Sequence, residues 1–407
     1  MSVTTTTSVG RTILTMDSAY GTIQRSVSTA PPREATREEI PLIDVSGIYS
    51  ENIEDRKAVA TQFRDAAINT GFFYIKNHGV DSELIDNAYQ NALRFFHQPE
   101  EIKKRISKDK FKFFNGYSAR YTTHGNKTES TDRKEHIAFQ YQPELDPAYD
   151  SLPHPIPLSM IPEEMHPWLK GEPEIWEGVS NLPGFKEAWV AYYRSCLTLA
   201  RSMTRTFALA LELPENYFDD IVTYPGADAT IAYYPGAEPG EKVDLSPQNV
   251  GLGSHTDNTG FTLLWQDMVG GLLVLNRKGE WIKASPIPDT FVVNIADFFQ
   301  RMTNDRWVST VHKVEINRSP EPRISMPFFF GENPSAFSRC PCCPNAVYNV
   351  VLGLPTDMGA LARLQSQRYL RRPAIMCYSR RTCQIRTNLL RRGKTPIHDL
   401  VPLVSGI

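Results

Sequence analysis

Apolar residues follow two different rhythms along the chain. Before about residue 210 they recur at helical spacing, as in 52–71, where Phe63 and Ala67 share one face, and in the long run 183–213. Beyond about residue 228 they form short runs separated by turn residues, a pattern that predicts seven strands. The Asn-Arg-Lys-Gly sequence at 276–279, between two of these runs, predicts a tight hairpin.

A helical first part followed by consecutive strands is typical of a β-barrel or sandwich flanked by helices, and so of an α+β, mainly β fold. We expect residues 1–39 to be a disordered leader, because they are rich in Ser and Thr and end in a Pro-containing, charged stretch. Residues 40–180 should carry helices and strands, with a long excursion of loops over 111–180. Residues 181–331 should hold the long helix and the β core, and 332–407 should form a tail.

Composition narrows the class of protein. The 407 residues are 41% hydrophobic and 22% charged, which is ordinary for a globular protein. The chain has no apolar stretch of the roughly 20 residues that a membrane helix needs, and its first residues lack the apolar core of a secretory signal. We therefore expect a cytoplasmic protein with no membrane partner. No motif supports a nucleic acid partner, and the oligomeric state cannot be read from the sequence.

Three predicted strands carry polar residues on the face that apolar neighbours mark as the interior. Alternate side chains of a strand point the same way, so His255 and Asp257 should face one side together if a strand starts there. His312 shares a face with the apolar residues of its strand, and Arg323 shares a face with Ser325. The three strands would thus aim a His-x-Asp pair, a His and an Arg-x-Ser pair at one interior.

These residue types suit one kind of metal centre. Two histidines and one carboxylate form the facial triad that holds non-haem Fe(II) and leaves coordination positions open for O2 and a co-substrate. A buried Arg323 needs an anionic partner, because its desolvation would otherwise be uncompensated. A bidentate contact, with a further hydrogen bond from Ser325, fits a dicarboxylic acid. Taken singly, each residue also has a structural interpretation: a capped strand start, a core histidine or an ion-pair arginine.

With these motifs in view, the chain resembles the iron(II)/2-oxoglutarate-dependent dioxygenases, in the branch of isopenicillin N synthase and the plant flavonoid and hormone oxygenases. The segments that carry the resemblance occur in the family's order and span residues 40 to about 331: IPLIDVS, GFFYIKNHGV, YYPG, HTDNTGFTLL, FVVNIAD, STVHKV and RISMPFFF. The resemblance implies a double-stranded β-helix (jelly-roll) core, an Fe(II) cofactor, and 2-oxoglutarate and O2 as co-substrates. It implies that His255, Asp257 and His312 bind the iron, and that Arg323 and Ser325 bind the distal carboxylate of 2-oxoglutarate.

Two further positions bear on the co-substrate. Tyr234 matches a family tyrosine that contacts 2-oxoglutarate, although Tyr233 is an equal candidate on sequence alone; position 232 is Ala, where many members have Asn. The implied activity is oxidation of a small-molecule metabolite, by hydroxylation, desaturation or ring closure, within specialised (secondary) metabolism. Two alternatives stay open: an iron oxidase like isopenicillin N synthase that does not use 2-oxoglutarate, and a catalytically inactive jelly-roll that serves as a binding protein.

The tail differs in composition from the rest of the chain. Between Arg339 and Lys394 it has eleven basic residues and a single acid, Asp357, and it carries five of the six cysteines. The cysteine spacing does not fit a structural zinc site, which needs regularly spaced pairs. We expect a poorly ordered segment that is either a natural variant end or the product of a shifted reading frame.

Overall fold

The computed structural model describes residues 10–334, except for 19–20, 112–114, 168, 170–172, 239, 241, 243 and 245. Apart from residues 301–305, this part of the chain forms one compact unit. The expectations for the Arg- and Cys-rich tail concern residues that lie outside the described part. Among the helices described, none has both the length and the apolar character needed to cross a membrane.

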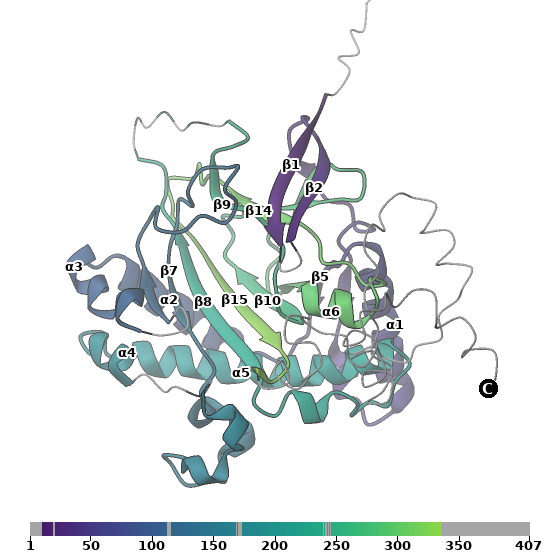
Figure 1. The fold of residues 1–407 in the computed structure, drawn as a ribbon, viewed down its shortest axis with the longest axis vertical. Helices are drawn as coiled ribbons and strands as arrows, with labels where there is room; N and C mark the ends of the chain where they lie inside the picture. The colour runs from purple at the N-terminus through teal and green to yellow at the C-terminus, as the bar shows by residue number, and fades with distance from the viewer. Residues whose placement is uncertain are drawn as a thin grey trace, which may run out of the picture. The chain divides into compact units, whose positions relative to one another are not determined.

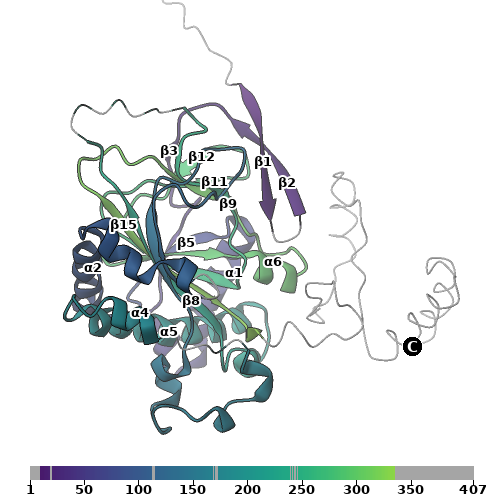
Figure 2. The same cartoon turned by 60° about the vertical axis from the view of Figure 1, so that its left-hand side comes forward.

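The core of the fold consists of two β-sheets (Figures 1 and 2). The larger sheet has eight strands, in the order β4 (Leu42–Asp44), β5 (Phe72–Lys76), β13 (Phe291–Ile295), β10 (Phe261–Gln266), β15 (Arg323–Gly331), β8 (Gly226–Tyr234), β7 (Glu135–Phe139) and β6 (Gly116–Ser118). The smaller has five, in the order β3 (Arg33–Glu34), β12 (Trp281–Lys283), β11 (Leu272–Leu275), β14 (His312–Glu315) and β9 (Val250–His255).

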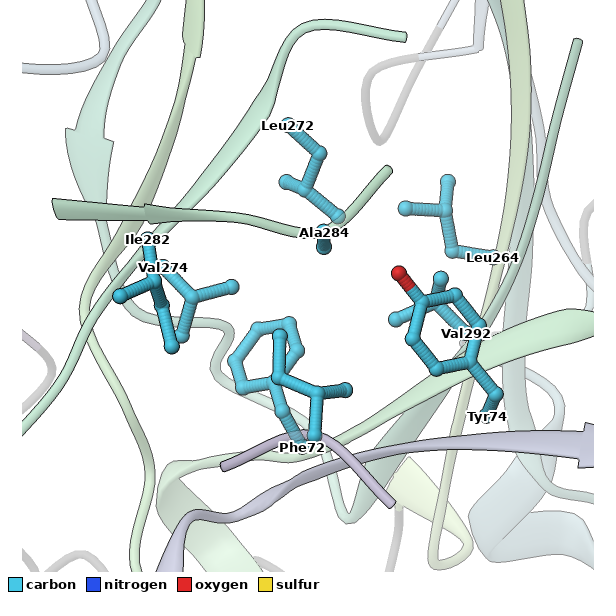
Figure 3. Close-up of a cluster of buried hydrophobic side chains, with 9 residues drawn as sticks. Phe72, Tyr74, Leu264, Leu272, Val274, Ile282, Ala284 and Val292 are labelled. Atoms are coloured by element: carbon cyan, nitrogen blue, oxygen red, sulfur yellow. The ribbon is translucent and has the colours of Figure 1, made fainter. Parts of the chain in front are cut away.

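Buried apolar side chains from both sheets pack against one another (Figure 3). Phe72 and Leu264 come from the eight-stranded sheet, and Leu272 and Val274 from the five-stranded sheet. The alternation of side chains along each strand supplies this apolar layer, because every second residue points to the same side. The two sheets therefore face each other, which agrees with the sandwich or barrel that the sequence predicts.

Helices cover the outer face of the larger sheet, and α5 (Phe185–Ala210) runs along it (Figure 1). Phe207 of α5 contacts Phe261 of β10 with ring centroids 5.0 Å apart, and the Tyr193 hydroxyl donates to the Ala227 carbonyl of β8. The other α-helices are α1 (Ile53–Asn69), α2 (Ser82–Phe96), α3 (Glu100–Lys103), α4 (Pro173–Gly178) and α6 (Asp297–Met302). Short 3-10 helices lie at Ser46–Tyr49, Lys104–Ile106, Lys108–Lys110, Pro143–Leu145, Pro147–Tyr149, Leu158–Met160, Glu163–Met165 and Asp219–Ile221.

Two of the sequence-based expectations were wrong in part. Within the supposed disordered leader, β1 (Arg11–Ser18) and β2 (Gly21–Ser28) pair as an antiparallel hairpin. Met16 and Val27 of this hairpin are buried in a cluster with residues of the five-stranded sheet, and that tertiary contact is invisible in the local Ser/Thr-rich composition. The excursion over 111–180 is likewise not only loops, because β6 and β7 extend the larger sheet there.

Candidate active site

Two histidines meet where β9 and β14 pair. The antiparallel register places His312 opposite His255, with ring centroids 4.3 Å apart. Nδ1 of His255 donates to the Gly253 carbonyl at 2.8 Å, and Nδ1 of His312 donates to the Thr310 carbonyl at 3.0 Å. A neutral imidazole that donates from Nδ1 carries its lone pair on Nε2. Both Nε2 atoms are therefore available as metal ligands.

Hydrogen bonds that the sequence did not predict position the Asp257 carboxylate beside the two histidines. β9 ends at His255, so the expectation that a strand starts there and aligns the two side chains was wrong. Instead, Oδ2 of Asp257 accepts hydrogen bonds from Thr262 Oγ1 at 2.5 Å and from Asn294 Nδ2 at 2.8 Å. The other oxygen, Oδ1, lies 3.5 Å from His255 Nε2 and 3.7 Å from His312 Nε2.

The three side chains titrate as a coupled group. Burial opposes the charged form of Asp257, but His312, His255 and the Thr262 hydroxyl outweigh it and hold the pKa of this carboxyl well below its usual range. Burial, together with the neighbouring His255, lowers the pKa of His312 to about 4. Burial alone would lower the pKa of His255, but its hydrogen bond to Asp257 and that residue's charge raise it. An ionised carboxylate beside a neutral His312 is the protonation pattern that a metal site requires.

The donor set fits one class of metal. One ligand atom from each of His255, Asp257 and His312 lies within 4.8 Å of the others, and the described residues supply no other such group of three or more potential ligands. Two imidazoles and one carboxylate on a single side of a cavity match the facial arrangement of non-haem Fe(II) sites, whose remaining positions stay open to other ligands. The residues present could therefore hold Fe(II).

A buried arginine, Arg323, lies on β15 of the larger sheet. Arg323 is 1% exposed and is paired in register with Tyr234, with its guanidinium 4.8 Å from that ring's centroid. It donates to Ser325 Oγ at 3.2 Å and to Gln266 Oε1 at 3.1 Å. Its buried Nε has no hydrogen-bond partner, and among the residues that the structure describes no carboxylate lies within ion-pair distance of it. A buried guanidinium with unused donors fits a carboxylate ligand.

One cavity of about 670 Å³ connects the histidine–aspartate group with the arginine. The sequence predicted six site residues, and all of them line this cavity: Tyr234, His255, Asp257, His312, Arg323 and Ser325. The structure also decides between the adjacent tyrosines. Tyr233 faces the helices and stacks on Phe96 with ring centroids 5.0 Å apart, whereas Tyr234 points into the cavity. Ala232, paired in register with Ser325, lines the cavity with an apolar side chain at that end.

Several residues that line or support the cavity were not predicted from the sequence. Thr262 and Asn294 hold Asp257, and Gln266 contacts Arg323, but they lie on strands whose sequence pattern marks only an apolar core. In the polar stretch 111–180, His136 lines the cavity. His124, in the same stretch, contacts the Glu129 carbonyl.

Comparison with known proteins identifies the family. Residues 40–158 match the model described as non-haem dioxygenase in morphine synthesis N-terminal, and residues 226–332 match the model of the 2OG-Fe(II) oxygenase superfamily. The chain belongs to the 2OG-Fe(II) oxygenase superfamily. The resemblance drawn from the sequence is thereby confirmed, as are the jelly-roll fold and the use of Fe(II), 2-oxoglutarate and O2.

Named relatives and solved structures agree with this assignment. The 2-oxoglutarate-Fe(II) type oxidoreductase ppzC of Metarhizium majus is 46% identical over 321 residues, which are 78% of this chain and 84% of the relative. A 2-oxoglutarate-Fe(II) type oxidoreductase of Aspergillus fumigatus is 32% identical over 74% of this chain and 84% of the relative. Among solved structures, Neurospora crassa T7H in complex with alpha-KG and 5-formyluracil has a TM-score of 0.57 at 27% identity, over 75% of this chain and 88% of that one. JOX2 in complex with 2OG, Fe and JA has a TM-score of 0.54 at 28% identity, over 75% and 78%.

These findings establish the class of reaction. The chain is a non-haem iron, 2-oxoglutarate-dependent dioxygenase that acts on a small molecule, and a role in secondary metabolism fits its fungal relatives.

Proposed function

We propose that His255, Asp257 and His312 are the protein ligands of the catalytic Fe(II), and that Arg323, Ser325 and Tyr234 bind the distal carboxylate of 2-oxoglutarate. The observation that carries the proposal is the coexistence, in one cavity, of three converging ligand atoms and a buried guanidinium with no carboxylate partner in the described part of the chain. A dicarboxylate that contacts the metal at one end and Arg323 at the other would provide a metal ligand and an anionic partner for the guanidinium.

Each residue has a distinct part in the reaction. Fe(II), when bound, supplies the activation of O2 that is coupled to the conversion of 2-oxoglutarate into succinate and CO2. Thr262 and Asn294 hold one oxygen of Asp257, so that the other oxygen faces the two Nε2 atoms. Gln266 and Ser325 orient the guanidinium of Arg323 and thereby fix the far end of the co-substrate. The remaining cavity wall orients a C–H bond of the substrate and limits the access of water.

For the product we infer a hydroxylated, desaturated or ring-closed small metabolite of specialised metabolism. The volume of the cavity, about 670 Å³, supports a small molecule. The sequence-based expectations of a cytoplasmic location and of no nucleic acid or membrane partner stay predictions.

The arginine gives the first test. Replacing Arg323 by Ala should raise the KM for 2-oxoglutarate by roughly 100-fold with a smaller effect on kcat, because two charge-assisted hydrogen bonds to the carboxylate are lost. Steady-state succinate release, with titration calorimetry of 2-oxoglutarate, measures the change. Arg318→Ala is the matched control, because Arg318 is 60% exposed and lies outside the cavity.

Two results would contradict the assignment. An unchanged KM in the Arg323 variant would remove the arginine from the co-substrate site. Substrate oxidation without succinate release would instead favour the oxidase alternative, in which Arg323 and Ser325 bind a carboxylate of the substrate itself.

A further inference from the structure

The cavity holds two charged side chains that neither the iron site nor the co-substrate site uses. Lys134 immediately precedes β7, and Asp228 lies on β8; both line the cavity. In the described part of the chain, no ion pair involves either of them. Unpaired charges in a confined cavity are costly, so a ligand that neutralises them would bind favourably.

Lys134 lies beside the tyrosine of the proposed co-substrate site. The register of β7 with β8 pairs Glu135 with Tyr233, which puts the preceding Lys134 beside Tyr234. Burial lowers the pKa of Lys134, although the charges of Asp132 and Asp257 oppose this. Lys134 lines the same cavity as the proposed metal ligands, yet its ammonium has no hydrogen-bonded acceptor among the described side chains.

Asp228 lies at a separate place on the same wall. In register across the larger sheet, Thr262 pairs with Phe329 and Phe329 pairs with Asp228, so Asp228 is two strands away from the residue that holds Asp257. Neighbouring strands are about 4.8 Å apart, which places the two backbones roughly 10 Å from each other. Burial raises the pKa of Asp228 to about 6, and only a hydrogen bond from the Tyr141 backbone opposes it.

When the site holds the metal and 2-oxoglutarate, the sum of the charges shows which ionised side chains of the cavity are not neutralised. A divalent ion, a doubly charged 2-oxoglutarate, the Asp257 carboxylate and the Arg323 guanidinium together carry no net charge. The two histidine ligands are neutral in the loaded site. Lys134 and Asp228 are then one cation and one anion that form no ion pair with any described residue, set apart on the same wall. Between them Thr230 and His136 offer neutral polar groups, and Nδ1 of His136 is buried without a hydrogen-bond partner.

We propose that the substrate is a zwitterion, with an anionic group bound by Lys134 and a basic nitrogen bound by Asp228. This proposal rests on the proposed function, because it assigns Arg323 to 2-oxoglutarate. Leu252, Leu264, Leu272 and Phe329 also line the cavity, so the part of the molecule between the two charges is expected to be largely apolar. Such a molecule would lie along the β7–β8 wall of the cavity, and the separation of its charges would determine which C–H bond faces the metal.

The test uses ω-amino acids of increasing length, from β-alanine to aminododecanoate, as probes. Titration calorimetry under anaerobic conditions, on the full chain loaded with Fe(II) and 2-oxoglutarate, compares each probe with the alkanoate and the alkylamine of equal length. The amino acid of one length in the series should bind about tenfold or more tightly than the alkanoate or the alkylamine of that length, because two charge-assisted contacts form together. Equal affinities at every length would overturn the proposal, and this comparison needs no variant to fold.

Variants assign the two ends. Asp228→Asn should remove the advantage of the amino acid over the alkanoate, and Lys134→Met should remove its advantage over the alkylamine. Asp44→Asn is the matched control, since Asp44 lies outside the cavity and contacts Lys76 at 3.3 Å. A zwitterion preference that survives both replacements would contradict the assigned residues.

The affinity for 2-oxoglutarate shows whether a negative result contradicts the substrate proposal or the proposed function. If the Lys134 variant loses affinity for 2-oxoglutarate rather than for the probe, Lys134 belongs to the co-substrate site and the proposal is wrong. If 2-oxoglutarate does not bind the wild-type protein, the proposed function itself fails. If 2-oxoglutarate binds normally and no zwitterion is preferred, only the substrate proposal fails.

Discussion

At the scale of single residues, the proposed iron site depends on side chains that contact the proposed ligands rather than the metal. Oδ2 of Asp257 is held by Thr262 and Asn294, which leaves Oδ1 facing the histidines. Backbone carbonyls fix Nδ1 of both histidines and so fix the orientation of their rings. Such contacts usually change metal affinity by about 10- to 100-fold when they are lost.

Thr262→Val tests this support directly. Valine has nearly the shape of threonine but cannot donate to Asp257, so Fe(II) affinity should fall by about tenfold or more while the fold is retained. Anaerobic metal titration measures the affinity. Thr290→Val is the control, because Thr290 is also buried but its hydroxyl donates to the Ile287 carbonyl. Equal iron affinity in the two variants would show that the Thr262 hydroxyl has no part in holding the ligand.

Residue types in the sequence predicted the chemistry, but not all of the contacts. Two histidines, an aspartate, an arginine and a serine on strand-like segments point to a facial triad and a carboxylate site. Thr262, Asn294 and Asp228 could not be found in this way, because each lies in an ordinary strand and gains its role only from the register of a neighbouring strand.

At the scale of elements, the helices were the most predictable part. The pattern of Ser82–Phe96 predicts α2 at the bounds that the structure has, and Gly71 follows α1 with the positive φ of +68° that glycine adopts freely. β9 was not predicted, because its Gly-rich sequence lacks strand-like alternation. Its position comes from contacts made far along the chain: Gly253 N–H donates to Asp132, and a side chain at 253 would come within 2.6 Å of the Asn126 backbone.

The β1–β2 hairpin gives a prediction at this scale. Met16 is buried against residues of the five-stranded sheet, so Met16→Ala should weaken the docking of the hairpin by about 2 kcal/mol or more. Hydrogen exchange of the backbone amides in β1 and β2 reports this as faster opening. Ile13→Ala serves as the control, because Ile13 lies on the same strand with 59% exposure. Protection that is lost equally in both variants would contradict docking through Met16.

The hairpin also bears on the cavity, since Asp17 and Ser18 at the end of β1 line it. A segment that composition alone marks as a leader thus contributes to the substrate space. Local composition could not indicate this, because the contact that orders the hairpin is made with strands more than 200 residues away in sequence.

At the scale of the whole molecule, ligand binding should stabilise the fold. An ion or co-substrate that binds only the folded chain adds about 2.7 kcal/mol when present at a hundred times its Kd. For a chain of this size, Mn(II) with 2-oxoglutarate should therefore raise Tm by roughly 5 °C. Scanning calorimetry measures the shift, which should vanish in Asp257→Ala. A shift of the same size in that variant would mean that the ligands stabilise the protein at another site.

The proposed reaction depends on one coordination site shared by two imidazoles and one carboxylate. The most direct measurement is the Fe(II) stoichiometry under anaerobic conditions, in the wild-type chain and in the single variants His255→Ala, Asp257→Ala and His312→Ala. We predict one tightly bound ion per wild-type chain, and none in any of the three variants at the same concentration. Full occupancy retained in any one of them would contradict the claim that these three residues bind the same iron.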